Sequence, residues 1–108
     1  MISFQDPMQT IIDIFEERHP KNNVTIQYVQ GMKEKADAWG ETFFPNDGGA
    51  PVVSIDVEIP VIGAIDVMAH ELAHVAMGPN GEHGEAWEKE YSEINNVFHK
   101  KFYYKGML

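Results

Sequence analysis

The sequence contains no cysteine among its 108 residues. Disulfide bonds and cysteine-ligated zinc ribbons are therefore excluded, and any metal ligands must be nitrogen or oxygen atoms. No apolar run approaches the length of a membrane-spanning helix, and the N-terminal stretch MISFQDPMQT lacks the basic segment and apolar run of a signal peptide. These absences favour a cytoplasmic protein and give no reason to expect a membrane partner.

Basic residues are scarce as well. Eight lysines and arginines stand against 17 aspartates and glutamates, which gives a formal net charge of -9. A surface with this excess of negative charge repels the phosphates of nucleic acids and of anionic membranes. Nucleic acid is therefore not an expected partner, and nothing in the sequence indicates an oligomeric state.

Length and composition are those of one folded domain. Hydrophobic residues make up 44% of the chain and charged residues 23%, close to the averages of globular proteins, so extensive disorder is not expected. A chain of 108 residues can form one modest core, and no repeat, linker or low-complexity segment divides it. We therefore expect a single domain that spans residues 1–108.

Helical signals occur in three segments. Asp6 and Pro7 have the residue types of an N-cap and a first helical position, and that helix is expected to end at His19, on the surface. Apolar residues recur at steps of three and four over residues 61–77, which predicts a second helix. A third helix is expected to begin near His83. Its apolar stripe, expected to pack in the core, consists of Trp87, Tyr91, Ile94 and Phe98.

Three shorter segments predict β-strands. Residues 24–29 and 51–59 alternate between apolar and polar side chains, and residues 38–44 form a third candidate. Residues 46–49, with the sequence NDGG, are a strong turn signal, so the second and third strands are expected to form a hairpin. The third strand is expected to place Val53, Ile55, Val57 and Ile59 on one face and Ser54, Asp56 and Glu58 on the other.

The chemically distinctive segment is HELAH, residues 70–74, inside the predicted helix over residues 61–77. At about 100° per residue, His74 lies about 40° from His70 around the helix axis, so both imidazoles can share one cation. Glu71 lies about 60° beyond His74, where its carboxylate can reach a water molecule bound to that cation. This is the HExxH arrangement of two zinc ligands and a general base. A buried pair of core histidines is the disfavoured alternative, because such polar groups are costly to bury without a metal.

A third ligand is expected, since a catalytic zinc site usually has three protein ligands and one open position. His83 follows a short turn that reverses the chain, so it can return toward His70 and His74. A solvent-facing histidine is the alternative interpretation of His83. Glu90 and Glu93 are the other candidate ligands, but glutamates on the polar face of an acidic helix are commonly solvated.

Two segments together resemble the signature of the SprT-like family of zinc metallopeptidases. HELAH matches the HExxH half, and HGEAW, residues 83–87, matches the His-Gly-x-x-aromatic segment that supplies the family's third ligand. The predicted hairpin that leads into the HExxH helix is also similar to that family, and the resemblance covers residues 36–98. The HExxH half alone is shared by many zincins.

The resemblance implies a fold, a site and an activity. The fold would be a minimal zincin-like α+β domain: an N-terminal helix, a three-stranded sheet with a hairpin, the HExxH helix and a C-terminal helix. His70, His74 and His83 would bind Zn2+, and Glu71 would be the catalytic glutamate. The activity would be hydrolysis of peptide bonds in a protein or peptide substrate by a metal-activated water, with Glu71 as the general base. The family's role on DNA-crosslinked proteins is not carried over, because the net charge opposes DNA binding.

Two other functions stay open at this point. In one, the zinc is structural and the chain is a non-catalytic binding module. In the other, the chain is a regulatory peptidase that a partner directs to a single protein target. The same three nitrogens would also be compatible with Mn, Co, Ni or Fe, although an open three-histidine site suits zinc.

Sequence also suggests how a substrate would lie. An extended peptide is expected to pair with the edge of the strand over residues 38–44, where Gly40 permits close backbone approach. A β-bulge is the alternative explanation of Gly40. Zincins often add a hydrogen-bond donor for the tetrahedral intermediate, and the candidates are Tyr91, His99, Tyr103 and Tyr104.

Overall fold

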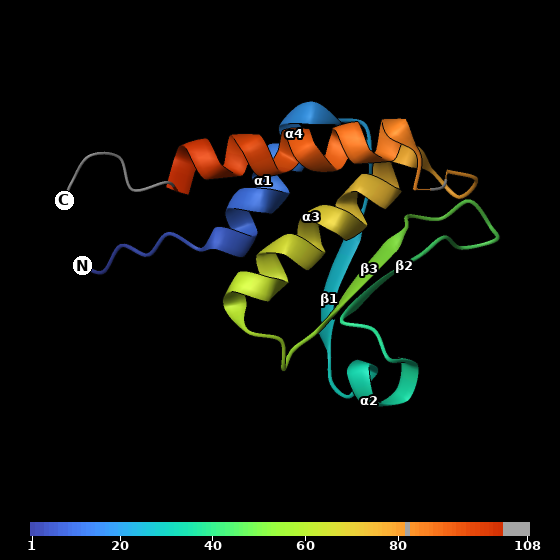
Figure 1. Cartoon of the computed structure of the whole chain (residues 1–108), viewed down its shortest axis with the longest axis horizontal. Coiled ribbons are helices and arrows are strands. Elements are labelled where there is room, and N and C mark those ends of the chain that lie inside the picture. The colour runs from blue at the N-terminus through green and yellow to red at the C-terminus, as the bar shows by residue number, and fades with distance from the viewer. Residues whose placement is uncertain (82, 103–108) are drawn as a thin grey trace.

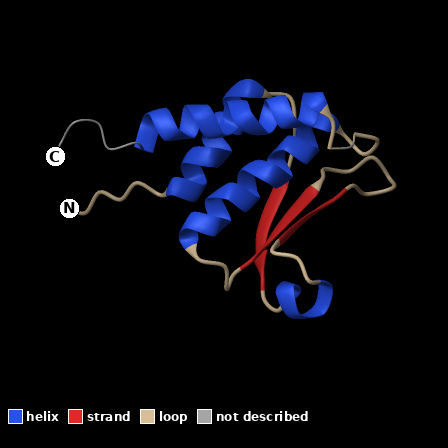
Figure 2. Cartoon of the chain, viewed as in Figure 1, coloured by secondary structure: helices blue, strands red, loops and turns tan. Residues whose placement is uncertain are grey.

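The computed structural model describes residues 1–81 and 83–102 (Figure 1). Within these residues the chain forms four helices and one three-stranded sheet, which confirms the predicted α+β class. The sheet lies on one side of the molecule and the three longer helices lie on the other (Figure 2). In chain order the elements are α1 (Pro7–Arg18), β1 (Thr25–Val29), α2 (Met32–Ala36), β2 (Gly40–Phe43), β3 (Val52–Asp56), α3 (Val61–Met77) and α4 (Glu85–Phe102).

Local sequence signals account for the boundaries of the longer helices. Pro7 begins α1 as predicted, and Asp6 caps it by accepting a hydrogen bond from the amide of Met8 at 2.9 Å. α3 has the predicted bounds and ends at Gly78, whose φ of 83° favours glycine. α4 begins at Glu85, close to its predicted start. None of the described helices is long and apolar enough to cross a membrane.

The sheet has the strand order β1-β3-β2. β2 pairs with β3 in antiparallel fashion, with Gly40 opposite Ile55 and Phe43 opposite Val52, which confirms the predicted hairpin. β1 pairs with β3 in parallel. β3 therefore lies in the middle of the sheet, and β2 forms an edge that contacts α3.

The core lies where the sheet, α1, α3 and α4 meet. Leu72 of α3 and Ile94 of α4 are 1% and 0% exposed, and full burial of each such side chain contributes about 1.5–3 kcal/mol. Val53 and Ile55, predicted on one face of this strand, are buried. Val57, predicted on the same face, is exposed because it follows the end of β3. This packing fixes α3 against the sheet and so determines where the HExxH residues lie.

The polar face of β3 is buried at two residues. Ser54 and Asp56 are 6% and 1% exposed. Asp56 accepts hydrogen bonds from the amides of Lys33 and Glu58, both at 2.9 Å, and the first of these contributes most to lowering the pKa of its carboxyl. Asp56 thus holds the first turn of α2, a short helix that was not predicted from the sequence.

Candidate metal centre

The end of α3 and the start of α4 bring three histidines together. His70 and His74 lie one turn apart on α3, and their ring centroids are 4.9 Å from each other. The chain then turns at Gly78 and returns His83, whose Nε2 lies 2.6 Å from Nε2 of His74. One nitrogen from each imidazole lies within 4.8 Å of the others, so the three are close enough to bind one metal ion. Glu82, within the predicted turn, lies outside the described residues.

The electrostatics of two of these histidines favour the form that binds metals. Burial lowers the pKa of His70, and the nearby His83 lowers it further. Burial also lowers the pKa of His74, with smaller contributions from His70 and His83. Both shifts favour the neutral ring, and a neutral imidazole is a metal ligand whereas an imidazolium is not. The donor set therefore fits a divalent metal such as Zn2+.

Two aromatic side chains of α4, those of Trp87 and Tyr91, lie beside the three imidazoles. The ring centroid of Trp87 is 4.8 Å from that of His70, 5.5 Å from His74 and 4.4 Å from His83. Its indole N–H donates to the carbonyl of His70 at 3.4 Å. Tyr91 stacks on Trp87 with a centroid distance of 5.2 Å. Trp87 and Tyr91, the first two residues of the apolar stripe of α4, therefore lie beside the histidines.

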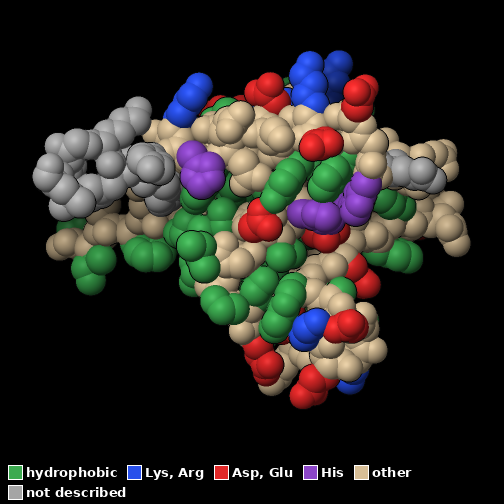
Figure 3. Space-filling model, in the orientation of Figure 1, with side chains coloured by type: hydrophobic (Ala, Val, Ile, Leu, Met, Phe, Trp, Pro, Cys, Tyr) green, Lys and Arg blue, Asp and Glu red, His purple; other side chains and the backbone are tan. Residues whose placement is uncertain are grey.

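The other half of that stripe behaves as predicted. Ile94 and Phe98 are 0% and 6% exposed and lie in the core. Trp87 and Tyr91 are only partly buried. Tyr91 still packs against the core cluster, so the prediction that the stripe packs in the core is confirmed for Tyr91, Ile94 and Phe98 and is wrong for Trp87. Figure 3 shows histidine side chains at the molecular surface with apolar and acidic side chains around them, so the site is open to solvent.

Glu71 lies beside the histidines but is held by the sheet. Its carboxylate Oε2 is 4.0 Å from Nε2 of His70, and the residue is 7% exposed. The hydroxyl of Thr42, on β2, donates to Oε1 of Glu71 at 2.8 Å. Burial raises the pKa of Glu71, and the hydrogen bond from Thr42 opposes that shift. The carboxylate is thus a stronger proton acceptor than an exposed glutamate.

Gly40 explains how α3 comes this close to β2. A Cβ atom at Gly40 would lie 2.5 Å from Cγ1 of Val67 and 3.3 Å from Cγ of Glu71. Gly40 pairs regularly with Ile55, so the β-bulge alternative is wrong. The segment that lies closest to Gly40 is helix α3. Neither this packing role nor Thr42 was identified from the sequence, because each depends on contacts between distant segments.

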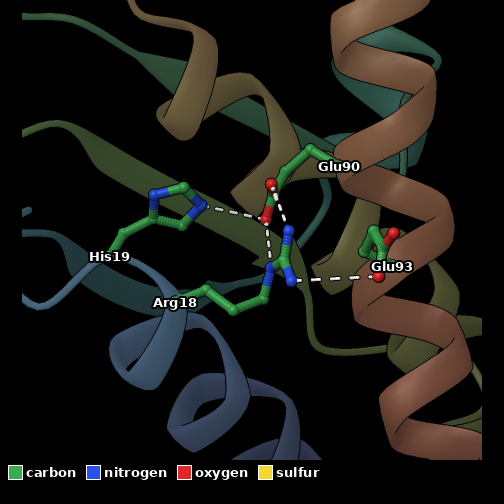
Figure 4. Close-up of polar contacts among 4 residues, drawn as sticks. All are labelled: Arg18, His19, Glu90 and Glu93. Carbon is green, nitrogen blue, oxygen red and sulfur yellow. Dashed lines mark hydrogen bonds and ion pairs between the residues drawn. The ribbon is translucent and has the colours of Figure 1, made fainter.

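The two glutamates considered as alternative ligands are engaged elsewhere (Figure 4). Glu90 is 7% exposed and accepts hydrogen bonds from Nε and Nη2 of Arg18, both at 2.8 Å. Nε2 of His19 lies 2.9 Å from the same carboxylate, so His19 is partly buried rather than a plain surface residue. Glu93 faces Arg18 at 3.9 Å. Both glutamates therefore lie against the end of α1, away from the three histidines.

Among the donor candidates that the structure describes, Tyr91 contacts the site. Its ring centroid is 6.1 Å from that of His70, and its hydroxyl donates to Asp66. Burial, together with the contact to Asp66, raises the pKa of Tyr91 to about 12, so the hydroxyl keeps its proton at neutral pH. His99 lies in the last turn of α4, near an apolar groove. Tyr103 and Tyr104 lie outside the described residues.

Comparison with family models, curated proteins and solved structures finds no match to the chain. The functional assignment therefore depends on the residues themselves. What the structure provides is a group of three imidazoles that can bind a metal ion, an adjacent buried carboxylate, and an edge strand in contact with that carboxylate.

Proposed function

We propose that the chain is a zinc-dependent peptidase of the SprT-like type, with Glu71 as the general base. One observation carries the proposal: three imidazoles converge within 4.8 Å of one another, and the Glu71 carboxylate lies 4.0 Å from one of them. A closed structural site would need a fourth protein ligand. His83 is exposed, which supports a position open to water and substrate.

The three histidines and Glu71 would have different roles in the reaction. His70, His74 and His83 would hold Zn2+, because three neutral nitrogen ligands with one open position suit this metal. When bound, the metal would act as a Lewis acid on water and on the scissile carbonyl. Glu71 would take the proton of the attacking water and pass it to the leaving amine. In the metal-free chain, burial raises the pKa of Glu71, which makes its carboxylate a stronger proton acceptor.

The substrate would be a protein or peptide in an extended conformation. β2 is an edge strand, so its outer side can pair with a peptide backbone through main-chain hydrogen bonds. The side chain of Thr42, in the middle of this strand, contacts Glu71. A peptide bound along β2 would therefore pass the proposed general base. Main-chain pairing of this kind selects weakly among side chains, which leaves room for a partner that directs the enzyme to one target.

Metal content and hydrolysis test the proposal together. Purified wild type should contain near-stoichiometric zinc by elemental analysis, and His83→Ala should contain much less. Glu71→Gln should keep the metal and lose hydrolysis of an unfolded protein substrate. No metal in either protein, without recovery after added zinc, would refute the proposal. Zinc in the wild type, combined with equal hydrolysis by wild type and Glu71→Gln, would instead identify a structural metal.

A further inference from the structure

Thr42 connects the edge strand to the candidate base. It lies on β2 opposite Val53, and its hydroxyl reaches two acceptors on one residue of α3. Oγ1 is 2.8 Å from Oε1 of Glu71 and 3.2 Å from the carbonyl oxygen of Glu71. Its neighbours Glu41 and Phe43 are exposed, as the alternation of a strand requires. Thr42 is therefore the β2 side chain directed at the site.

The buried Glu71 carboxylate has few other polar contacts that could fix its orientation. Within residues 1–81 and 83–102, Thr42 is the side chain that donates a hydrogen bond to this carboxylate. The nearest imidazole nitrogen, on His70, is 4.0 Å away, which is beyond hydrogen-bond distance. A glutamate side chain with three rotatable bonds would otherwise sample several rotamers.

We infer that Thr42 is a positioning residue, whose hydroxyl holds the Glu71 carboxylate toward the three histidines. The catalytic consequence of this inference rests on the proposed peptidase function, whereas the positioning itself does not. Gly40 contributes to this positioning, because the absence of its side chain allows α3 to approach β2 closely enough for the hydrogen bond between Thr42 and Glu71.

The two acceptors belong to the side chain and the main chain of the same residue, so the Thr42 hydroxyl relates the carboxylate to the backbone of α3. A valine has nearly the same shape but no hydroxyl, so it could donate to neither acceptor.

Three variants separate positioning from a general structural role. Thr42→Val keeps the shape and removes the hydroxyl, whereas Thr42→Ser keeps the hydroxyl. Thr10→Val is the matched control, because Thr10 is buried, Thr42 is half-buried, and the hydroxyl of Thr10 also donates to a backbone carbonyl, that of Asp6 at 3.2 Å. We expect Thr42→Val to lower kcat by about 10- to 100-fold with little change in KM. Thr42→Ser should restore most of kcat, and Thr10→Val should not lower it.

A second readout requires no activity. Protein labelled with 13C at the glutamate side-chain carboxyl gives a Glu71 resonance, which the Glu71→Gln spectrum identifies by its loss. In zinc-free protein this resonance should move in Thr42→Val and stay in place in Thr42→Ser and Thr10→Val. If Thr42→Val does not fold, Thr42→Ala provides the same comparison with a smaller side chain.

The outcomes distinguish this inference from the proposed function. An unmoved Glu71 resonance in Thr42→Val, or wild-type kcat in that variant, would overturn the positioning role even if Glu71→Gln is inactive. Equal losses of kcat in Thr42→Val and Thr42→Ser would overturn it as well. A moved resonance in Thr42→Val, combined with a wild-type protein that has no peptidase activity, would support the positioning role and refute the proposed function alone.

Discussion

Gly40→Ala tests how closely β2 and α3 must pack. The new Cβ would stand 2.5 Å from Cγ1 of Val67, about 1 Å inside the optimal separation of two carbon atoms. Val67 is β-branched and cannot easily rotate away, so the strand and the helix must separate. We expect the free energy of unfolding to fall by about 1–3 kcal/mol, the usual cost of overpacking, measured by urea denaturation.

The same displacement would also reach the site. A separation of about 1 Å would lengthen the bond between Thr42 and Glu71 from 2.8 Å to about 3.8 Å, beyond hydrogen-bond distance. Gly40→Ala should therefore move the Glu71 carboxyl resonance as Thr42→Val does.

A double-mutant cycle with Val67→Ala provides the control. That substitution removes the atom with which the new Cβ collides, so Gly40→Ala should cost much less in its background. Equal costs in both backgrounds would show that the contact with Val67 is not the reason for glycine. An unchanged free energy of unfolding in the single variant would refute the packing argument altogether.

Three further predictions concern stability. Arg18→Met should lower the free energy of unfolding by about 1–3 kcal/mol, measured by urea denaturation. The substitution leaves His19 as the remaining partner of the buried Glu90 carboxylate, and the partial exposure of Arg18 reduces the cost. The pKa of Glu90 is lowered, chiefly by Arg18, so its contribution to stability should be present above its unfolded pKa and lost as the pH falls through its folded pKa. Glu90→Gln should flatten this part of the pH profile. Zn2+ at 100 times its Kd should add about 2.7 kcal/mol, seen as a higher Tm, and His74→Ala should abolish the shift.

The sequence was sufficient for features that local patterns determine. Asp6 and Pro7 marked the start of α1, and the recurrence of apolar residues gave α3 its bounds. The spacing of HELAH placed two imidazoles on one helical face, and the short turn before His83 was enough to predict its return. Each of these depends on residues within one element or on one turn.

The features that were missed depend on contacts across the fold. The alternation of its strand placed Asp56 on a polar face but did not indicate its burial, which depends on the hydrogen bond from the amide of Lys33 in α2. α2 has only five residues, too few to be recognised by periodicity or to be stable alone, and its position depends on that distant carboxylate. Trp87 was assigned to the core because an apolar stripe on a helix does not indicate which neighbour covers each residue.

Thr42 shows why a candidate site extends beyond its sequence motif. The HELAH motif places Glu71 on the correct face of the helix. It does not define the rotamer of Glu71, since a carboxylate on that face can point in several directions. The direction comes from a hydroxyl 29 positions away in sequence, on a strand whose nearby glycine lets the helix approach. An HExxH helix without such a donor would still bind a metal through its histidines. It would position its base less well, so metal binding and hydrolysis should respond differently to substitutions on β2.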